Sequence, residues 1–244
     1  MSHTFHDLNL QTSLSSGNSS IEEIVQRADT LGIDHIAITD YLTDHQDLQQ
    51  LRDRLNDLPE SEVTVHSGVK IRADDERELK DKLSAFRDHV EVVIVHGGDV
   101  EINRAACEDT RVDILAHPEF KRKDSGIDHV ITKKAAENRV CIEITFRSLL
   151  KTYGKLRSQI MSHMQRNVRL CKKYEAPLIL NSGARSIHEM RQPRDMLGLA
   201  QSLGIDLGDS FALVEKHPAA ILERADDGLS GNQIMPVVEV EDDD

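Results

Sequence analysis

The chain has 244 residues, of which 39% are hydrophobic and 3% aromatic, so its length allows a single domain and its core must be aliphatic. The three cysteines, Cys107, Cys141 and Cys171, are widely spaced, which argues against a zinc ribbon and a disulfide framework. No apolar run approaches the ~20 residues of a membrane span, and the polar N-terminus lacks the apolar core of a signal peptide. These features predict a protein of the reducing cytoplasm.

Charge is distributed unevenly along the chain. The formal net charge is −13, yet residues 121–194 hold 17 of the 30 lysines and arginines and only six of the 43 acidic residues. Because a solvated surface normally mixes its signs, this segregation predicts one face that binds a polyanion, with nucleic acid as the first candidate. The alternative is that basic helices merely balance acidic neighbours within one fold. The acidic excess also suggests a salt-rich cytoplasm.

Strand and helix patterns alternate from the N-terminus onward. Apolar or alternating runs predict seven strands, at 5–10, 34–39, 63–71, 90–95, 112–116, 140–145 and 177–180. Ser20 and Glu23 form a capping-box pattern for a first helix that ends near Gly32. Further helices are expected at 155–174, at 193–203 and around 217–224. Repeated βα units at this length favour an α/β fold, a distorted TIM-like barrel of about seven strands, over an open doubly wound sheet.

One barrel domain is expected to span residues 1–225 and to contain the basic segment 121–194. The remaining residues, 226–244, include Gly228 and Gly231 and end in a run of acidic residues. Such a composition cannot bury enough apolar surface to fold, so we expect a disordered acidic tail there.

In a βα barrel, reactive side chains stand at the carboxyl ends of the strands. Residues expected at these positions include several that could bind a metal, namely Asp7, Asn9, Asp40, His66, His96, His117 and Glu143. This layout resembles the polymerase and histidinol phosphatase (PHP) family. The resemblance implies a distorted barrel that holds metal ions for phosphoester hydrolysis.

The ligand pattern of the PHP family is, however, largely lost. Asp40 and His117 survive, but Lys70 stands where the family has a glutamate in its third strand. The family's His-x-His, Thr-Asp-His and Asp-x-His motifs correspond here to Asp7-Leu8-Asn9, Thr39-Asp40-Tyr41 and Asn181-Ser182-Gly183-Ala184. An ammonium at a ligand position opposes metal binding. We therefore predict no bound metal and no catalytic residue, with Asp7, Asp40 and His117 as vestigial ligand candidates.

Two alternatives remain open for these residues. Asp7, Asp40, His66, His96 and His117 could converge on a single weak metal site, which would support a PHP-type metal-dependent phosphoesterase. Otherwise the three histidines are hydrogen-bonding residues near the barrel mouth.

A second resemblance rests on four ordered segments in the later part of the chain, at 122–130, 146–150, 181–184 and 191–195. Together they resemble the thirty-kilodalton protein subunit family of archaeal and eukaryotic ribonuclease P, which itself resembles the PHP barrel with its ligands lost. The resemblance implies a noncatalytic protein that binds a catalytic RNA and helps it remove the 5′ leader from precursor tRNA. Catalysis and Mg²⁺ then belong to the RNA, and this chain needs no cofactor of its own. The implied partners are that RNA, precursor tRNA, a small RRM-like protein subunit and the other protein subunits.

Basic residues after the expected strands fit this reading on their own chemistry. A loop after the fifth strand carries three cations just before a helix expected to start at Asp128, and arginines follow the sixth and seventh strands. The predicted RNA-binding residues are Lys121, Arg122, Lys123, Arg147, Arg185, Arg191 and Arg194, with Lys172, Lys173, Asn181 and Ser182 as secondary contacts. Alternatively, Arg147 and Arg191 pair with Glu143 or Asp195 inside the fold, and Asn181 and Ser182 are ordinary loop residues. Few aromatic residues lie near this segment, so recognition by backbone and shape is expected.

Overall fold

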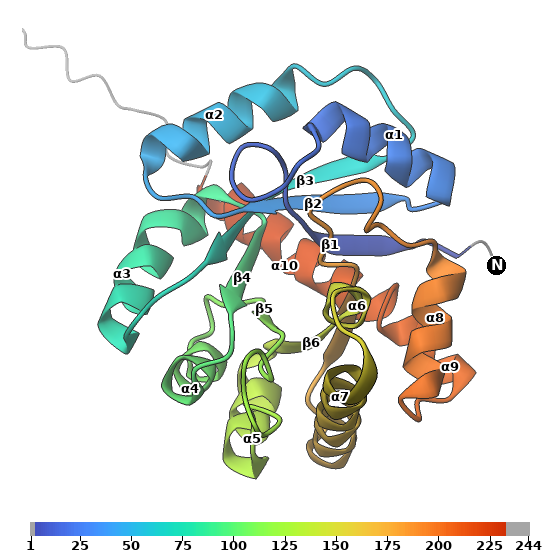
Figure 1. Ribbon diagram of the computed structural model, residues 1–244. Helices are drawn as coiled ribbons and strands as arrows, with labels where there is room; N and C mark the ends of the chain where they lie inside the picture. The colour runs from blue at the N-terminus through green and yellow to red at the C-terminus, as the bar shows by residue number, and fades with distance from the viewer. Residues whose placement is uncertain (1–2, 233–244) are drawn as a thin grey trace, which may run out of the picture.

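Seven parallel strands form one sheet in which each strand pairs with the next along the chain. The computed structural model describes residues 3–232, and Figure 1 shows the strands curving into a nearly closed barrel with helices around the outside. The strands are β1 (His6–Leu10), β2 (His35–Asp40), β3 (Thr64–Ile71), β4 (Val92–His96), β5 (Ile114–Ala116), β6 (Cys141–Thr145) and β7 (Leu178–Asn181). The predicted TIM-like barrel and all of its predicted strands are confirmed.

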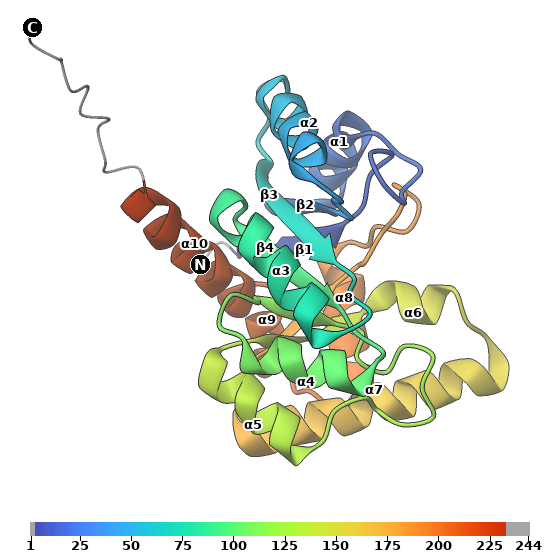
Figure 2. The ribbon, with the colours of Figure 1, turned by 90° about the vertical axis from the view of Figure 1, so that its left-hand side faces the viewer.

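Helices follow the strands and cover the outer face of the sheet, as Figures 1 and 2 show from two sides. They are α1 (Ile21–Leu31), α2 (His45–Asn56), α3 (Glu76–Phe86), the short 3₁₀ helix η1 (Arg87–His89), α4 (Val100–Glu108), α5 (His129–Asn138), α6 (Phe146–Leu150), α7 (Gly154–Tyr174), α8 (Pro193–Ser202), α9 (Leu207–Ala212) and α10 (Lys216–Asn232). The expected capping box forms at α1, because Glu23 N donates to Ser20 Oγ at 3.2 Å and Ser20 N donates to Glu23 Oε2 at 2.9 Å. Asp128 caps α5 through Val130 N and Ile131 N.

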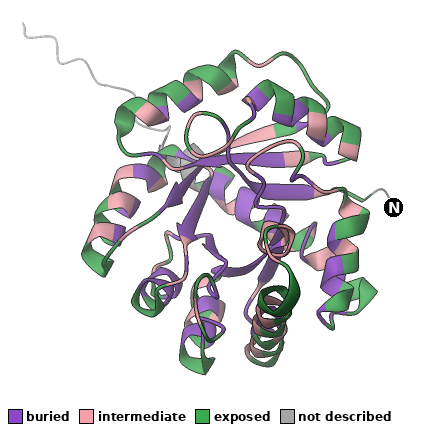
Figure 3. Cartoon of the chain, viewed as in Figure 1, coloured by how far each residue is buried: buried purple, intermediate pink, exposed green. Residues whose placement is uncertain are grey.

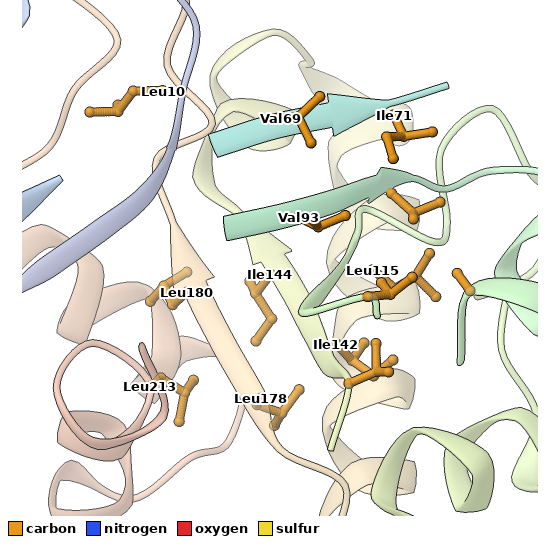
Figure 4. Close-up of a cluster of buried hydrophobic side chains, with 14 of the residues drawn as sticks. Leu10, Val69, Ile71, Val93, Leu115, Ile142, Ile144, Leu178, Leu180 and Leu213 are labelled. Carbon is orange, nitrogen blue, oxygen red and sulfur yellow. The ribbon is translucent and has the colours of Figure 1, made fainter. Parts of the chain in front are cut away.

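Two apolar clusters form the core, one outside and one inside the sheet. Alternation along β6 sends Ile142 and Ile144 to the larger cluster between strands and helices, part of which is drawn in Figure 4. Buried positions dominate the strands in Figure 3. The smaller cluster fills the barrel interior, where Ile221 and Leu222 of α10 join residues from the strands. Helix α10 therefore plugs the barrel from the end at which the strands begin.

The edges of the sheet, β1 and β7, meet through side-chain and loop hydrogen bonds. Leu8 N donates to Asn181 Oδ1 at 2.9 Å, and Ser182 N donates to Asp7 Oδ1 at 3.1 Å. Gln11 N donates to the carbonyl of Ala184 at 2.9 Å. These bonds bring the carboxyl ends of β1 and β7 together, so the barrel mouth is a continuous ring of strand ends.

Helix α10 corrects the expected start of the acidic tail. It runs to Asn232, so residues 226–232 are helical rather than the beginning of a disordered segment. Leu222 and Ala225 are buried, and this packing carries the helix past the acidic pair Asp226 and Asp227. The rest of the expected tail, residues 233–244, lies outside the described residues.

The three cysteines lie in the interior of the fold. Cys107, Cys141 and Cys171 are free thiols and all are buried. Burial raises the pKa of Cys141 to about 12, so this thiol stays protonated and unreactive at neutral pH. Among the described helices, none is both long and apolar enough to cross a membrane.

Candidate functional site

Polar side chains replace apolar ones inside the barrel near its mouth. Lys70 of β3 is only 3% exposed, and its Nζ donates to Asn9 Oδ1 at 3.2 Å. Asn9 Nδ2 donates in turn to Glu143 Oε1 at 2.7 Å, so the amide links a buried ammonium to a buried carboxylate. Burial lowers the pKa of Lys70 to about 8, an effect that the charge of Glu143 opposes. Lys70 therefore still carries its charge at pH 7.

Glu143 is fully engaged in this network. Its carboxylate also accepts hydrogen bonds from Asn181 Nδ2 at 2.8 Å and from Thr145 Oγ1. The donors come from β1, β6 and β7, so the carboxylate fastens three strand ends to one another. A group bonded in this way serves structure and is not free to act as a metal ligand or a general base.

The vestigial ligand candidates do not converge on one point. Asp7 accepts the hydrogen bond from Ser182 N, and Asp40 accepts from Thr12 N and Oγ1 at 2.8 and 2.6 Å, so each carboxylate holds a loop in place. His117 instead packs edge-on against His96, with ring centroids 4.5 Å apart. Within residues 3–232, no group of three or more His, Cys, Asp or Glu side chains is placed to hold a metal ion. The chemistry of these donors therefore does not fit the metal centre of the PHP family.

His66 lies away from the mouth, contrary to the expectation from the sequence. It stands near the start of β3, where its Nδ1 is 2.6 Å from Glu91 Oε1 and its Nε2 is 3.1 Å from His35 Nδ1. The assignment is wrong because the strand extends four residues further, to Lys70 and beyond, before it reaches the mouth. Its role as a hydrogen-bonded histidine is confirmed, but at the opposite end of the barrel.

The histidines that do reach the mouth are neutral. Tyr41 Oη lies 2.7 Å from His96 Nδ1. Burial lowers the pKa of His96 to about 3, with smaller contributions from Lys70 and the other cations around it. The pKa of His117 is also held well below its usual range by burial. His96 is hydrogen-bonded as expected, whereas His117 Nδ1 has no partner within the described residues.

A cavity of about 420 Å³ opens at the mouth, above the Lys70 network. Phe120, Leu156 and Ile160 give it an apolar wall. Leu156 is 55% exposed although it is apolar, because α7 begins beyond the end of the barrel (Figure 2). Seven cations also line the cavity: Lys70, Arg72, Lys121, Arg122, Arg147, Lys151 and Arg185.

Some of these cations have acidic partners and others have none. Arg122 donates to both carboxylate oxygens of Asp124 at 2.6 and 2.9 Å, and Arg147 and Lys151 share Glu189. Arg72 instead lies over the Tyr41 ring and Lys121 over the Phe120 ring. In the described part of the chain, neither of these two nor Arg185 pairs with a carboxylate. The cavity wall therefore carries excess positive charge.

The basic loop after β5 is held in a fixed conformation. Asn103 Nδ2 donates to the carbonyls of Pro118 and Gly126 at 3.1 and 2.8 Å, which closes the loop from below. Gly126 has a φ of 77°, and a Cβ at this position would lie 1.9 Å from the carbonyl oxygen of Pro118. Only glycine fits this turn. The loop thus presents Lys121, Arg122 and Lys123 from a rigid base.

Comparison with known proteins assigns the family. A sequence model of the family described as RNase P subunit p30 matches residues 4–227. The chain belongs to this family. Ribonuclease P protein component 3 of Methanothermobacter thermautotrophicus is 33% identical over 196 residues, which cover 80% of this chain and 78% of that protein.

Solved structures agree with this assignment. A chain in the cryo-EM structure of archaeal ribonuclease P with mature tRNA has a TM-score of 0.77 and 26% identity, covering 97% of this chain and 100% of that one. A candidate histidinol phosphatase from Listeria monocytogenes has a TM-score of 0.52 at 12% identity, covering 78% of this chain and 98% of that one. This second likeness concerns the fold alone and confirms the PHP-like barrel. The chain is thus a ribonuclease P subunit of the p30 family with a PHP-like fold.

The structure places most of the predicted RNA-binding residues of this p30 family member at the mouth end of the barrel, but Arg191 lies in a separate pocket beside Phe5 and His6. Lys121, Arg122, Arg147 and Arg185 line the cavity, and Lys123 is exposed on the same loop. Arg194 is exposed in the first turn of α8 and does not line the cavity.

Arg147 and Arg191 do make contacts inside the fold, as the alternative interpretation of the sequence expected, but with other partners. Arg147 Nε donates to Glu189 Oε2 at 2.8 Å, rather than to Glu143 or Asp195. Arg191 Nη1 donates to the carbonyls of His188 and Met190 and lies over the Phe146 ring. Both side chains are only half-buried, so each keeps donors that face solvent.

Burial excludes two of the four secondary RNA contacts, and the structure places the other two, which are exposed, away from the cavity. Asn181 and Ser182 are completely buried, so they cannot touch a partner; they close the barrel instead. Lys172 and Lys173 lie in the last turn of α7, which carries the chain from the mouth back to the start of β7. They therefore stand at the opposite end of the barrel from the cavity.

Sequence reasoning missed three cations of the site. The sequence identifies Lys70 only as a residue that opposes metal binding, and it does not single out Arg72 or Lys151 as site residues. A signal for two of them was present, because Lys70 and Arg72 flank the last residue of a predicted strand, and side chains there reach a barrel mouth. Lys151 had no such signal, since only the packing of α6 brings it to Glu189.

Proposed function

We propose that this chain is the RNA-binding protein subunit that supports the catalytic RNA of ribonuclease P while the 5′ leader is removed from precursor tRNA. Membership of the p30 family supports a role in this enzyme. The likeness to a chain of an archaeal ribonuclease P bound to mature tRNA supports a place beside RNA. The observation that carries the proposal is the gathering of cations from separate loops at one end of the barrel.

The exposed cations at the mouth end of the barrel can bind phosphate groups of a folded RNA. Lys121, Lys123 and Arg194 are exposed and have no carboxylate partner within residues 3–232, so a phosphate does not have to displace an internal salt bridge. Arg122 and Arg147 are oriented by Asp124 and Glu189 and keep further N–H donors. Among the aromatic residues near them, Phe120 and Tyr153 are 40% and 86% exposed, so base stacking is limited to these two side chains and most contacts are expected with the RNA backbone and shape.

Catalysis is assigned to the RNA and not to this chain. The imidazoles at the mouth are neutral, Glu143 is held by three hydrogen bonds, and the described residues include no group of side chains placed to hold a metal ion. Mg²⁺ is accordingly expected on the RNA. The geometry does not favour the alternative of a PHP-type phosphoesterase, because Lys70 and Asn9 fill the space in which ligands would have to converge.

The remaining partners follow from the family resemblance. We expect the small RRM-like subunit and the other proteins of the complex to bind surfaces that leave the basic mouth free for RNA. This part of the proposal is tested by measuring RNA binding with and without the small subunit.

Reconstituted cleavage of precursor tRNA tests the function directly. Omitting this protein should slow cleavage, and the triple variant Lys121→Ala, Lys123→Ala, Arg194→Ala should weaken binding to the ribonuclease P RNA. Each lost phosphate contact should lower the slope of log affinity against log salt by about 0.9 on a duplex region. Arg54→Ala with Arg77→Ala is the control, because both arginines are exposed on the acidic first half. Equal effects of control and test variants would contradict the proposed RNA face.

A further inference from the structure

The cavity at the mouth is more than a basic surface, because charged and polar groups are buried in its wall. Lys70, His117 and Glu119 line it and are 3%, 8% and 4% exposed. His117 Nδ1 and Glu119 Oε2 have no hydrogen-bond partner among the described residues. These two atoms are themselves covered by protein, so they belong to a polar wall behind the cavity surface, and Lys70 is the charged group that this wall holds almost completely buried.

The cations around the cavity repel one another. The pKa of Arg185 is lowered, first by burial and then by the charge of Arg147. Lys70 feels the charges of Arg185, Arg147 and Arg72, with only Glu143 opposing them. Because Glu143 is already saturated by Asn9, Asn181 and Thr145, an anion in the cavity would relieve this repulsion.

We propose that the cavity binds the phosphate group of a phosphate ester, with Lys70, Arg72 and Arg185 around the phosphate and the organic part against Phe120, Leu156 and Ile160. A volume of about 420 Å³ accommodates more than a bare ion, and the lining combines a cationic side with an apolar side. The ester is either a nucleotide of the bound RNA or a free small molecule, and both present the same chemistry. This inference does not rest on the proposed function, because the isolated chain can be tested with small ligands.

Calorimetric titration of the full chain at constant ionic strength provides the test. The probes are adenosine 5′-monophosphate, inorganic phosphate and adenosine. We expect the monophosphate to bind, inorganic phosphate to bind more weakly and adenosine not to bind detectably. Binding of inorganic phosphate as tight as that of the monophosphate would overturn the role of the apolar wall, and absence of binding by both would overturn the site.

Substitutions at the cations locate the site. Arg185→Gln and Arg72→Gln should each weaken monophosphate binding about tenfold, as expected for loss of one charge-assisted contact. Arg166→Gln removes an exposed arginine of α7 outside the cavity and should change affinity less than twofold. Similar losses in all three variants would mean that the monophosphate is attracted by overall charge, which would overturn the proposal.

Lys70→Met tests the buried cation, with circular dichroism to check folding. If this variant folds, it should lose monophosphate binding; retained binding would overturn the role of Lys70. If it does not fold, the arginine variants decide. Adding ribonuclease P RNA at saturation distinguishes the two sources: displacement of the monophosphate identifies the ester as an RNA nucleotide, and simultaneous binding identifies it as a free molecule. Unchanged RNA binding in the variant Lys121→Ala, Lys123→Ala, Arg194→Ala, together with intact monophosphate binding by the wild type, would contradict the proposed function and leave this site standing.

Discussion

Asp7 is a buried carboxyl group with one oxygen unsatisfied. Its Oδ1 accepts from Ser182 N, whereas Oδ2 has no partner in the described part of the chain. Burial raises the pKa of Asp7 to about 7. The residue corresponds to a metal-ligand position of the PHP pattern, and without a metal nothing positive stabilises its charged form there.

Asp7→Asn should change the pH dependence of stability. The folded-state pKa lies above that of the unfolded chain, so the native state binds this proton more tightly. The stability contributed by the protonated carboxyl is complete below about pH 4 and is lost as the pH rises through about 7. Asparagine removes this loss, so the variant should gain up to about 4 kcal/mol relative to the wild type between about pH 4 and pH 8. Urea denaturation across this range measures the difference, and a difference that does not vary with pH would refute the assignment.

At the scale of one element, the loop between β5 and α5 joins a basic sequence to a constrained backbone. His117 and Lys121 both have positive φ values, 37° and 57°, and Gly126 has 77°. Such conformations are costly for non-glycine residues and persist only where the surroundings hold them. Here Asn103 supplies that support through its two hydrogen bonds to the loop carbonyls.

Gly126→Ala should therefore be clearly destabilising. The new Cβ would collide with the Pro118 carbonyl, and the left-handed backbone would be strained, so we expect a loss of about 1–3 kcal/mol and weaker RNA binding. Gly198→Ala in α8 is the matched control: a Cβ there meets no atom within 4 Å, and the change should stabilise by about 0.5–1 kcal/mol. Thermal unfolding of both variants decides, and equal effects on stability would show that the loop is not constrained as described.

At the scale of the whole molecule, the barrel separates two ends with different properties. The mouth gathers cations from several loops, whereas α10 closes the other end with apolar residues (Figure 2). Helix α7 spans the distance between them, since its 21 residues extend about 30 Å. Basic residues close in sequence can therefore lie on opposite ends.

Two double variants test this separation. Lys121→Ala with Lys123→Ala removes two exposed lysines at the mouth, and Lys172→Ala with Lys173→Ala removes two at the other end. Both lower the net charge equally, so a general electrostatic effect would be the same for the two. We expect the first pair to weaken affinity for ribonuclease P RNA about tenfold or more and the second to change it less than threefold. Filter binding at several salt concentrations measures both affinities. A larger loss from the second pair would show that the RNA binds at the end opposite the mouth, which would contradict the proposed RNA face.

The sequence predicted those residues of the candidate site that closely follow a predicted strand. Lys121, Arg122 and Arg147 follow predicted strands closely, and a parallel barrel brings such positions to one face whatever the details of packing. Asn181 and Ser182 also follow a strand, yet they are buried, because the seam between β1 and β7 uses their polar groups. Sequence position gives the end of the barrel on which a residue lies, but it does not give the residue's exposure.

The sequence by itself determined the barrel, the order of its strands and the loss of the metal ligands, because periodicity and residue type are local properties. The family resemblance also rested on local motifs. Only the tertiary structure decided that Asn9 links Lys70 to Glu143, that Glu189 holds Arg147 and Lys151, and that His66 and Lys172 face away from the mouth. These contacts join residues far apart in the chain, and their partners are chosen by how the strands and helices pack. The net positive charge of the cavity depends on which cations lack an acidic partner. Only the tertiary structure shows these pairings, so the charge could not be obtained from the sequence.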